Sequence, residues 1–134
     1  MTSEEIAKFI DHTQLAPEAT PLDIANLCVE ARMLNVAAVC FSPSFLPLSA
    51  LLLADLISSN INVACVIGFP SGAHAGAVKA FEARQATQNG ATEIDMVGNL
   101  GFVFDLCFCG SAEQSSAEQS SVDLCFCGSA EQNS

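Results

Sequence analysis

The sequence predicts an α/β domain built on a parallel sheet of about four strands. Between residues 2 and 101, four short runs of apolar or β-branched residues alternate with stretches of helical periodicity. The strand candidates are separated by 27 residues from Val36 to Val63, and by 30 residues from Val63 to Glu93. Such intervals match a strand–helix unit repeated through right-handed crossovers, which makes the strands parallel. The architecture is then half of an eight-stranded barrel, which needs about 250 residues when complete, or an open doubly wound sheet.

The expected strands carry one unusual charge. They cover residues 9–13, 36–41, 63–68 and 93–97, each composed mainly of apolar or β-branched residues. In the last of them Asp95 lies inside the apolar run Ile94 to Val97, so we expect a buried carboxylate. Because a buried charge is costly unless it is paired or used, Asp95 is a candidate functional residue.

The first long helix has a clear start signal. Thr20 can cap it through its hydroxyl, Pro21 suits the first helical position, and Asp23 lies three residues after the cap. Its expected apolar face recurs close to helical spacing at Ile24, Leu27, Cys28, Ala31 and Leu34. This pattern predicts a helix that packs on the sheet.

Two further helices are expected between the later strands. One covers residues 44–57, with Pro47 tolerated in its first turn. The other covers residues 75–88 and ends at Asn89 and Gly90, a left-handed C-terminal stop. Cys28 on a helix and Cys65 in a strand are interpreted as small core residues.

Composition excludes several classes of protein. The chain has 134 residues, 51% hydrophobic, which favours one folded domain with a real core. Its net charge of -11 argues against nucleic-acid binding, which needs basic side chains to neutralise phosphates. The apolar stretch at residues 46–57 is interrupted by Pro47, Ser49 and Asp55 and falls short of a membrane span. The acidic start of the chain is unlike a signal peptide, so we expect a cytoplasmic protein.

Residues 102–134 differ from the rest and are expected to form an irregular acidic tail. They contain five acids and no base, and the ten residues from Asp105 recur identically from Asp123. We interpret this duplication as low-complexity sequence, since a folded array needs at least three repeats. The alternative is a thiol-rich metal or redox module built on Cys107, Cys109, Cys125 and Cys127, although the usual Cys-x2-Cys spacing is absent.

Four motifs resemble deoxyribose-phosphate aldolases in order and spacing. They are Ile10 to Thr13, Val39-Cys40 followed by Ser42 to Ser44, Val66 to Gly72, and Glu93 to Val97. Together they cover roughly residues 4–101. The resemblance implies that residues 1–101 are the N-terminal half of a (β/α)8 barrel of this family.

The resemblance also implies a reaction and its residues. A class I aldolase of this family reversibly cleaves 2-deoxyribose 5-phosphate to acetaldehyde and glyceraldehyde 3-phosphate through a lysine Schiff base, without a metal or other cofactor. By motif, Asp95 is similar to the aspartate that relays protons. Asp11, Thr13 and Cys40 are similar to residues of the substrate pocket. The expected partner of the complete enzyme is therefore a small phosphorylated sugar.

The lysines of that chemistry are missing from the sequence. The only two lysines are Lys8 and Lys79, and the family's essential lysines lie on later strands. We expect Lys8 before the first strand and Lys79 in the third helix, both away from the C-terminal rim of the sheet, where barrel chemistry occurs. The chain is then a truncated aldolase, inactive alone. The alternative is a non-catalytic half-barrel that covers its open edges by self-association.

Overall fold

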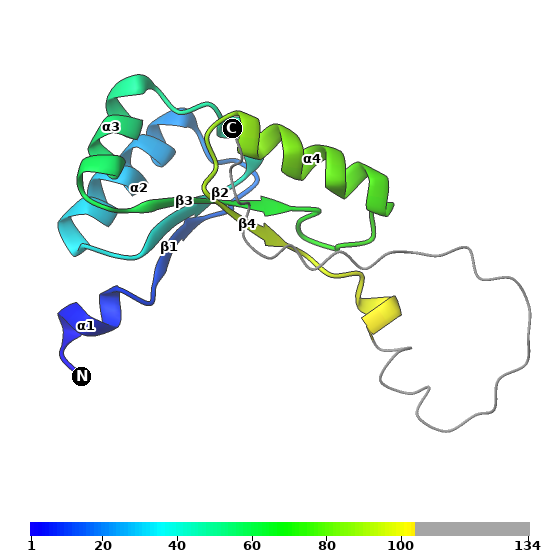
Figure 1. Ribbon diagram of the computed structural model, residues 1–134, viewed down its shortest axis with the longest axis horizontal. Helices are drawn as coiled ribbons and strands as arrows, with labels where there is room; N and C mark the ends of the chain where they lie inside the picture. The colour runs from blue at the N-terminus through cyan, green and yellow to red at the C-terminus, as the bar shows by residue number, and fades with distance from the viewer. Residues whose placement is uncertain (104–134) are drawn as a thin grey trace, which may run out of the picture.

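A computed structural model describes residues 1–103, in which helices and strands alternate along the chain (Figure 1). A single 3-10 turn, η1, interrupts the alternation after the second strand. In chain order the elements are α1 (Ser3–Ala7), β1 (Asp11–Gln14), α2 (Pro21–Leu34), β2 (Ala38–Phe41), η1 (Pro43–Phe45), α3 (Ala50–Ser58), β3 (Asn62–Ile67), α4 (Gly76–Gln88) and β4 (Glu93–Met96).

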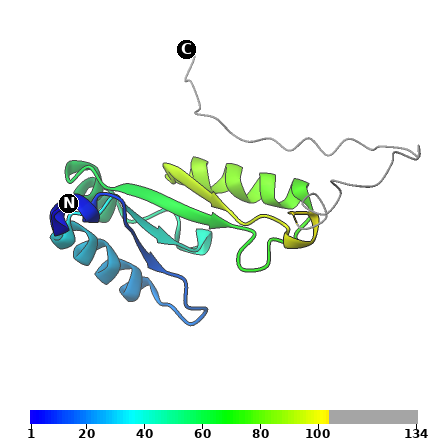
Figure 2. The same ribbon diagram turned by 90° about the horizontal axis from the view of Figure 1, so that it is seen from below.

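The four strands form one parallel sheet in the order β1-β2-β3-β4. The long helices α2, α3 and α4 lie on one side of it (Figure 1), and β1 and β4 lie on opposite edges (Figure 2). A doubly wound sheet reverses its strand order and carries helices on both faces. The sequential order with helices on one side is instead that of half a (β/α)8 barrel, so the predicted fold class is confirmed.

The sheet divides the apolar side chains between its two faces. On the helix side, Val39, Phe41 and Val63 pack with the buried face of α2 and with Leu56 of α3. Cys65 and Ile67 pack against Ala86 of α4 on that same side. The buried residues of α2 are Ile24, Leu27, Cys28 and Ala31, as predicted, whereas Leu34 is exposed.

The opposite face of the sheet holds small residues. Ala38 and Cys40 of β2 are buried there together with Ala64 and Val66 of β3, and Leu15 packs against them. Side chains alternate between faces along a strand, so these four residues must face away from the helices. In a closed barrel this face lines the interior, and we call it the inner face.

The predicted burial of Asp95 is wrong for this chain. All four residues of β4 are exposed, including Asp95. β4 pairs with β3 on one side only, and within residues 1–103 nothing covers its other edge. The apolar composition of residues 94–97 therefore fits a strand with two neighbours, of which only one is present in the described part.

The predicted start of α2 is confirmed, and the predicted start of α3 is not. Thr20 and Asp23 form the predicted capping box of α2, with Thr20 N donating to Asp23 Oδ2 at 2.7 Å. The hydrogen bonds from Thr20 hold the pKa of Asp23 below its ordinary value. The predicted start of α3 is wrong, because η1 and an extended segment through Pro47 precede Ala50, and Ser49 is the cap.

The later segments include one confirmation and one correction. Gly90 has a φ of 105° and ends α4, as the Asn89-Gly90 pair predicts. Residues 100–103 are helical, whereas the irregular tail is expected to begin at residue 102. The duplicated segment and its four cysteines lie outside the described residues. Within residues 1–103, no helix has the length and apolarity to cross a membrane, and the cytoplasmic location stays a prediction.

Gly72 is expected to tolerate no side chain. Its φ is 66°, and a Cβ there would lie 2.1 Å from the carbonyl oxygen of Gly98. Substitution Gly72→Ala should lower the free energy of unfolding by about 3 kcal/mol or more, because backbone on both sides must move. Gly76→Ala is the control, since nothing lies within 4 Å of its Cβ position. Urea unfolding of both variants measures the difference, and equal stabilities would contradict this packing.

Candidate functional site

The four candidate residues predicted from the sequence lie on the inner face. Asp11 and Thr13 pair in register with Ala38 and Cys40 of β2. Asp95 pairs in register with Val66 of β3. Because residues paired across a sheet share a face, all four candidates point to the side away from the helices. Three strands thus contribute to one surface.

Cys40 lies at the centre of this group. Its side chain is 4% exposed, and burial is the first cause that raises the pKa of its thiol to about 11. The negative charges of Asp95 and then Asp11 raise this pKa further, whereas a hydrogen bond with Thr13 opposes the rise. The same residues that the motifs single out are therefore the electrostatic neighbours of Cys40. At neutral pH the thiol is protonated and serves as an apolar wall.

Lys79 lies closer to this site than its helix suggests. It belongs to α4, as predicted, but its Nζ donates to the carbonyl of Val97 at 3.0 Å and to that of Gly72 at 3.1 Å. Val97 directly follows β4, and Gly72 lies in the loop after β3. The prediction that Lys79 is remote from the C-terminal rim is therefore wrong, because its flexible stem carries the ammonium there.

Glycine at position 68 makes room for this lysine. A Cβ on Gly68 would lie 2.7 Å from Cδ of Lys79, so the lysine stem packs directly over the glycine backbone. Glu82, one turn further along α4, accepts a hydrogen bond from Gly68 N at 2.8 Å. Val97 N in turn donates to Ile67 O at 2.9 Å. Lys79 and Glu82 together hold the carboxyl ends of β3 and β4 in place.

Sequence reasoning did not anticipate this pair. The available signal is a lysine and a glutamate three residues apart, early in a helix that follows a glycine-containing turn. Residues at this spacing lie on the same face of a helix and can reach the same strand end. The lysine also reaches the end of β4, because its side chain is long.

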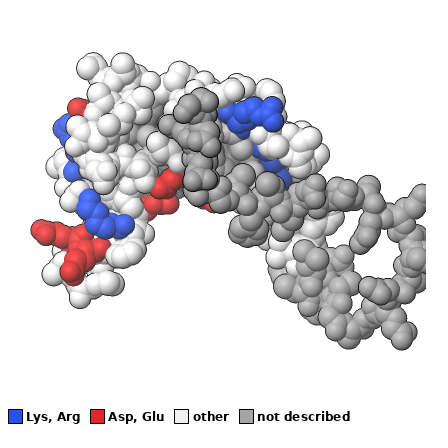
Figure 3. Space-filling view, viewed as in Figure 1, with Lys and Arg blue, Asp and Glu red and all other residues white. Residues whose placement is uncertain are grey.

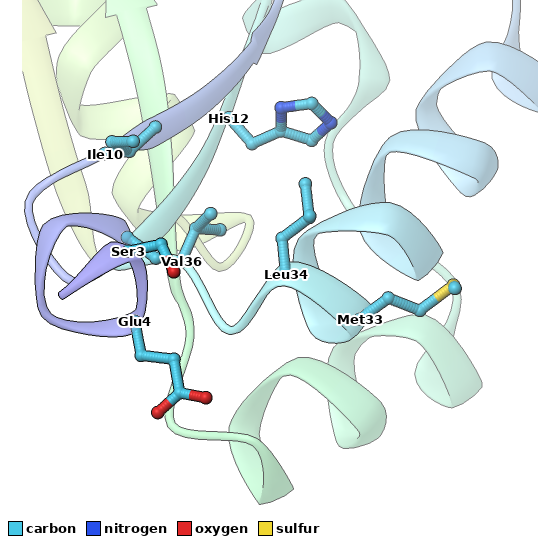
Figure 4. Close-up of a pocket in the computed structure, with 8 residues that line it drawn as sticks. Ser3, Glu4, Ile10, His12, Met33, Leu34 and Val36 are labelled. Carbon is cyan, nitrogen blue, oxygen red and sulfur yellow. The ribbon is translucent and has the colours of Figure 1, made fainter.

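An open groove of about 510 Å³ lies away from the inner face, beside the amino end of β1 (Figure 4). His12 points toward the helix side there, and its Nε2 lies 2.9 Å from Oε2 of Glu30 on α2. His12 is therefore a linking residue between β1 and α2, as expected of a structural histidine. Because barrel chemistry uses the other end of the strands, this groove is separate from the candidate site. It is lined by Ser3, Glu4, Ala7, Ile10, His12, Met33, Leu34 and Val36.

The charges of the site are mainly negative. Asp11, Glu93 and Asp95 lie on the inner face by register, and Figure 3 shows acidic atoms beneath the strands and basic atoms over α4. Within residues 1–103, no group of three His, Cys, Asp or Glu side chains has the arrangement of a metal site. Lys79 is the cation at this end of β3 and β4, and two of its three donors are already engaged by carbonyls.

No protein-family model matches the chain, but individual relatives do. A deoxyribose-phosphate aldolase from Natranaerobius thermophilus is 50% identical over 103 residues, which are 77% of this chain and 46% of that protein. The deoxyribose-phosphate aldolase of Mannheimia succiniciproducens is 47% identical over 103 residues, covering 45% of its length. The recognition made from the four motifs is confirmed. The chain spans about half the length of these curated relatives.

Solved structures agree with the sequence relatives. A protein from Coccidioides immitis assigned as a deoxyribose-phosphate aldolase superposes with a TM-score of 0.69 at 38% identity, over 78% of this chain and 40% of that one. The tetrameric deoxyribose phosphate aldolase of Aeropyrum pernix gives a TM-score of 0.65 at 32% identity, over 75% and 42%. The described fold therefore matches under half of each solved aldolase chain.

The thiol of Cys40 is expected to be slow to alkylate. A pKa of about 11 instead of the ordinary 9.0 leaves about 100-fold less thiolate at pH 8, and the rate should still rise above pH 10. Asp95→Asn removes one neighbouring charge and should lower this pKa, while burial keeps it above the ordinary value. Mass spectrometry of the peptide containing Cys40 measures the rates, with Asp55→Asn as control. A rate that levels off near pH 9 would contradict the assigned surroundings.

Lys79→Met is expected to loosen the end of β4. The substitution keeps an apolar stem over Gly68 but removes the two hydrogen bonds to Gly72 and Val97, so stability should fall by about 1–2 kcal/mol. Hydrogen exchange of the Val97 amide should accelerate more than that of the Val63 amide. Arg84→Met, an exposed change on the same helix, is the control. Unchanged exchange at Val97 would show that Lys79 does not hold this strand end.

Proposed function

We infer that this chain, which is related to deoxyribose-phosphate aldolases, supplies the N-terminal half of such an enzyme. The complete enzyme would cleave 2-deoxyribose 5-phosphate to glyceraldehyde 3-phosphate and acetaldehyde through a Schiff base, a step in deoxyribonucleotide breakdown. The observation that carries the proposal is the convergence of Asp11, Thr13, Cys40 and Asp95 on one sheet face, in a chain 50% identical to an aldolase. Residues 1–101 are the proposed aldolase unit, and residues 102–134 a separate tail.

Each inner-face residue has a proposed role. Asp95 is proposed to relay protons between the substrate and water, since its carboxylate is exposed on the inner face and close enough to influence the charge of Cys40. Asp11, the first residue of β1, offers a carboxylate acceptor to substrate hydroxyl groups, and Thr13, the third, offers its hydroxyl. Protonated Cys40 forms the apolar floor between them. No step of this scheme uses a metal or another cofactor.

The chain lacks the nucleophile that the reaction needs. A Schiff base requires a lysine whose amine is neutral and free to attack a carbonyl. Nζ of Lys79 donates to two backbone carbonyls, and Lys8 donates to Asn35 at the far end of β1. Both amines are thus engaged as donors, and neither lies on the inner face. We propose that the Schiff-base lysine and the phosphate-binding groups belong to the missing half.

Borohydride trapping tests whether the chain alone has this chemistry. Incubation with 2-deoxyribose 5-phosphate and sodium borohydride should give no covalent adduct, because both lysine amines are engaged elsewhere. The full-length Natranaerobius thermophilus relative serves as the positive control and should gain the reduced adduct. Intact-mass measurement detects either result. An adduct on Lys79 in this chain would overturn the assignment of the nucleophile to the missing half.

Fragment complementation tests the proposed function itself. The chain should recover aldolase activity when mixed with the C-terminal half of the Natranaerobius thermophilus relative, which carries what this chain lacks. Asp95→Asn should then lower kcat about 100-fold or more, the usual worth of a positioned proton carrier. Asp55→Asn, a change on the outer surface, should leave kcat unchanged. Recovered activity that is insensitive to Asp95→Asn would refute the relay role.

A further inference from the structure

Both edges of the sheet are open within residues 1–103, and apolar side chains are exposed beside each edge. β1 pairs only with β2, and β4 pairs only with β3. Beside β1, Phe9 is 81% exposed and Ile10 is 44% exposed. On β4, Ile94 is 37% exposed and Met96 is 48% exposed. Open parallel edges with apolar flanks are templates for adding another strand.

We propose that two copies of this chain close into one eight-stranded parallel barrel, with β4 of each copy paired to β1 of the other. A twofold rotation about an axis along the strands preserves strand direction, so β1 of the second copy meets β4 in the parallel sense. The same rotation brings β4 of the second copy to β1. One contact made twice then removes every edge, and four strands from each copy give the eight of a closed barrel.

The residues of the inner face and the length of the chain favour a second copy as the partner that covers this face. Ala38, Cys40, Ala64 and Val66 are small or apolar, as is suitable for a barrel interior filled from both sides. The chain spans 46% of the length of its relative from Natranaerobius thermophilus, so the missing cover has about the size of the chain itself. A second copy supplies that size, the correct strand direction and the same helix-covered outer surface. The proposal does not depend on aldolase activity.

The negative charges of the inner face oppose this closure, so the affinity of the dimer should depend on salt concentration. Asp11, Glu93 and Asp95 of each copy would face the same interior, and Cys40, the other titratable group of that face, is uncharged at neutral pH. Lys79 lies at the rim with its donors on carbonyls. Screening by salt weakens the repulsion. Dimerisation should therefore tighten with added salt.

Sedimentation of the full chain tests the proposal. The expected species has twice the 14.0 kDa mass of one chain, with no larger assembly. Ile10→Lys or Met96→Lys, on opposite edges, should each give monomers, because both edges take part in the same repeated contact. Leu51→Lys is the matched control, since Leu51 is 82% exposed on α3, away from both edges. Circular dichroism separates loss of the dimer from loss of the fold.

A photo-crosslinker at position 96 decides which strands meet. In a mixture of isotopically light and heavy chains, the crosslink should join β4 of one copy to β1 of the other. A monomer at all concentrations, a crosslink of β4 to β4, or a crosslink of β4 to residues 104–134 of its own chain would each overturn the proposal. Growth beyond the dimer would overturn it as well, because a closed barrel leaves no free edge.

Discussion

The burial of β3 on both faces is the constraint on which the rest of this structure depends. Val63, Cys65 and Ile67 pack under the helices, while Ala64 and Val66 face the inner side. A parallel strand buried in this way must have a neighbour at each edge and cover on each face. β2 and β4 provide the neighbours, and α3 and α4 provide the cover on one face. Within residues 1–103, Leu15 is the partly buried apolar residue that packs on the inner face.

Much of this arrangement could be predicted from the sequence because it is local or periodic. The spacing of the strand candidates predicts parallel order, and the Thr20 capping box predicts the start of α2 correctly. Pro47 misled the prediction for α3, since a proline early in a helical pattern can lie either inside the first turn or before it. Ser49, which caps the helix, is the better signal, as its hydroxyl accepts from Leu52 N.

The candidate site shows a different limit of the sequence. The alternation of side chains along a strand predicts that Asp11 and Thr13 share one face of the sheet. It does not predict that Cys40, on another strand, lies on that same face, because this depends on the register between the strands. The exposure of Asp95 could not be predicted from the sequence. An apolar run indicates a strand that is buried between two neighbours in a complete sheet, but β4 pairs with β3 only. Lys79 was misjudged because its ammonium lies about five bonds from its backbone, where helix position no longer decides location.

The two faces of the sheet therefore differ in how far this chain can satisfy them. The outer face of β2 and β3 is covered, because α2, α3 and α4 bury its apolar residues, whereas Ile94 and Met96 of β4 stay exposed. The inner face instead gathers carboxylates around a small apolar floor and places its nearby cation, Lys79, in hydrogen bonds to the backbone. In the proposed enzyme, the cations that bind the sugar phosphate would come from outside residues 1–103. The chemistry proposed for this face thus depends on a second structural half, whereas the helices that cover β2 and β3 are already present.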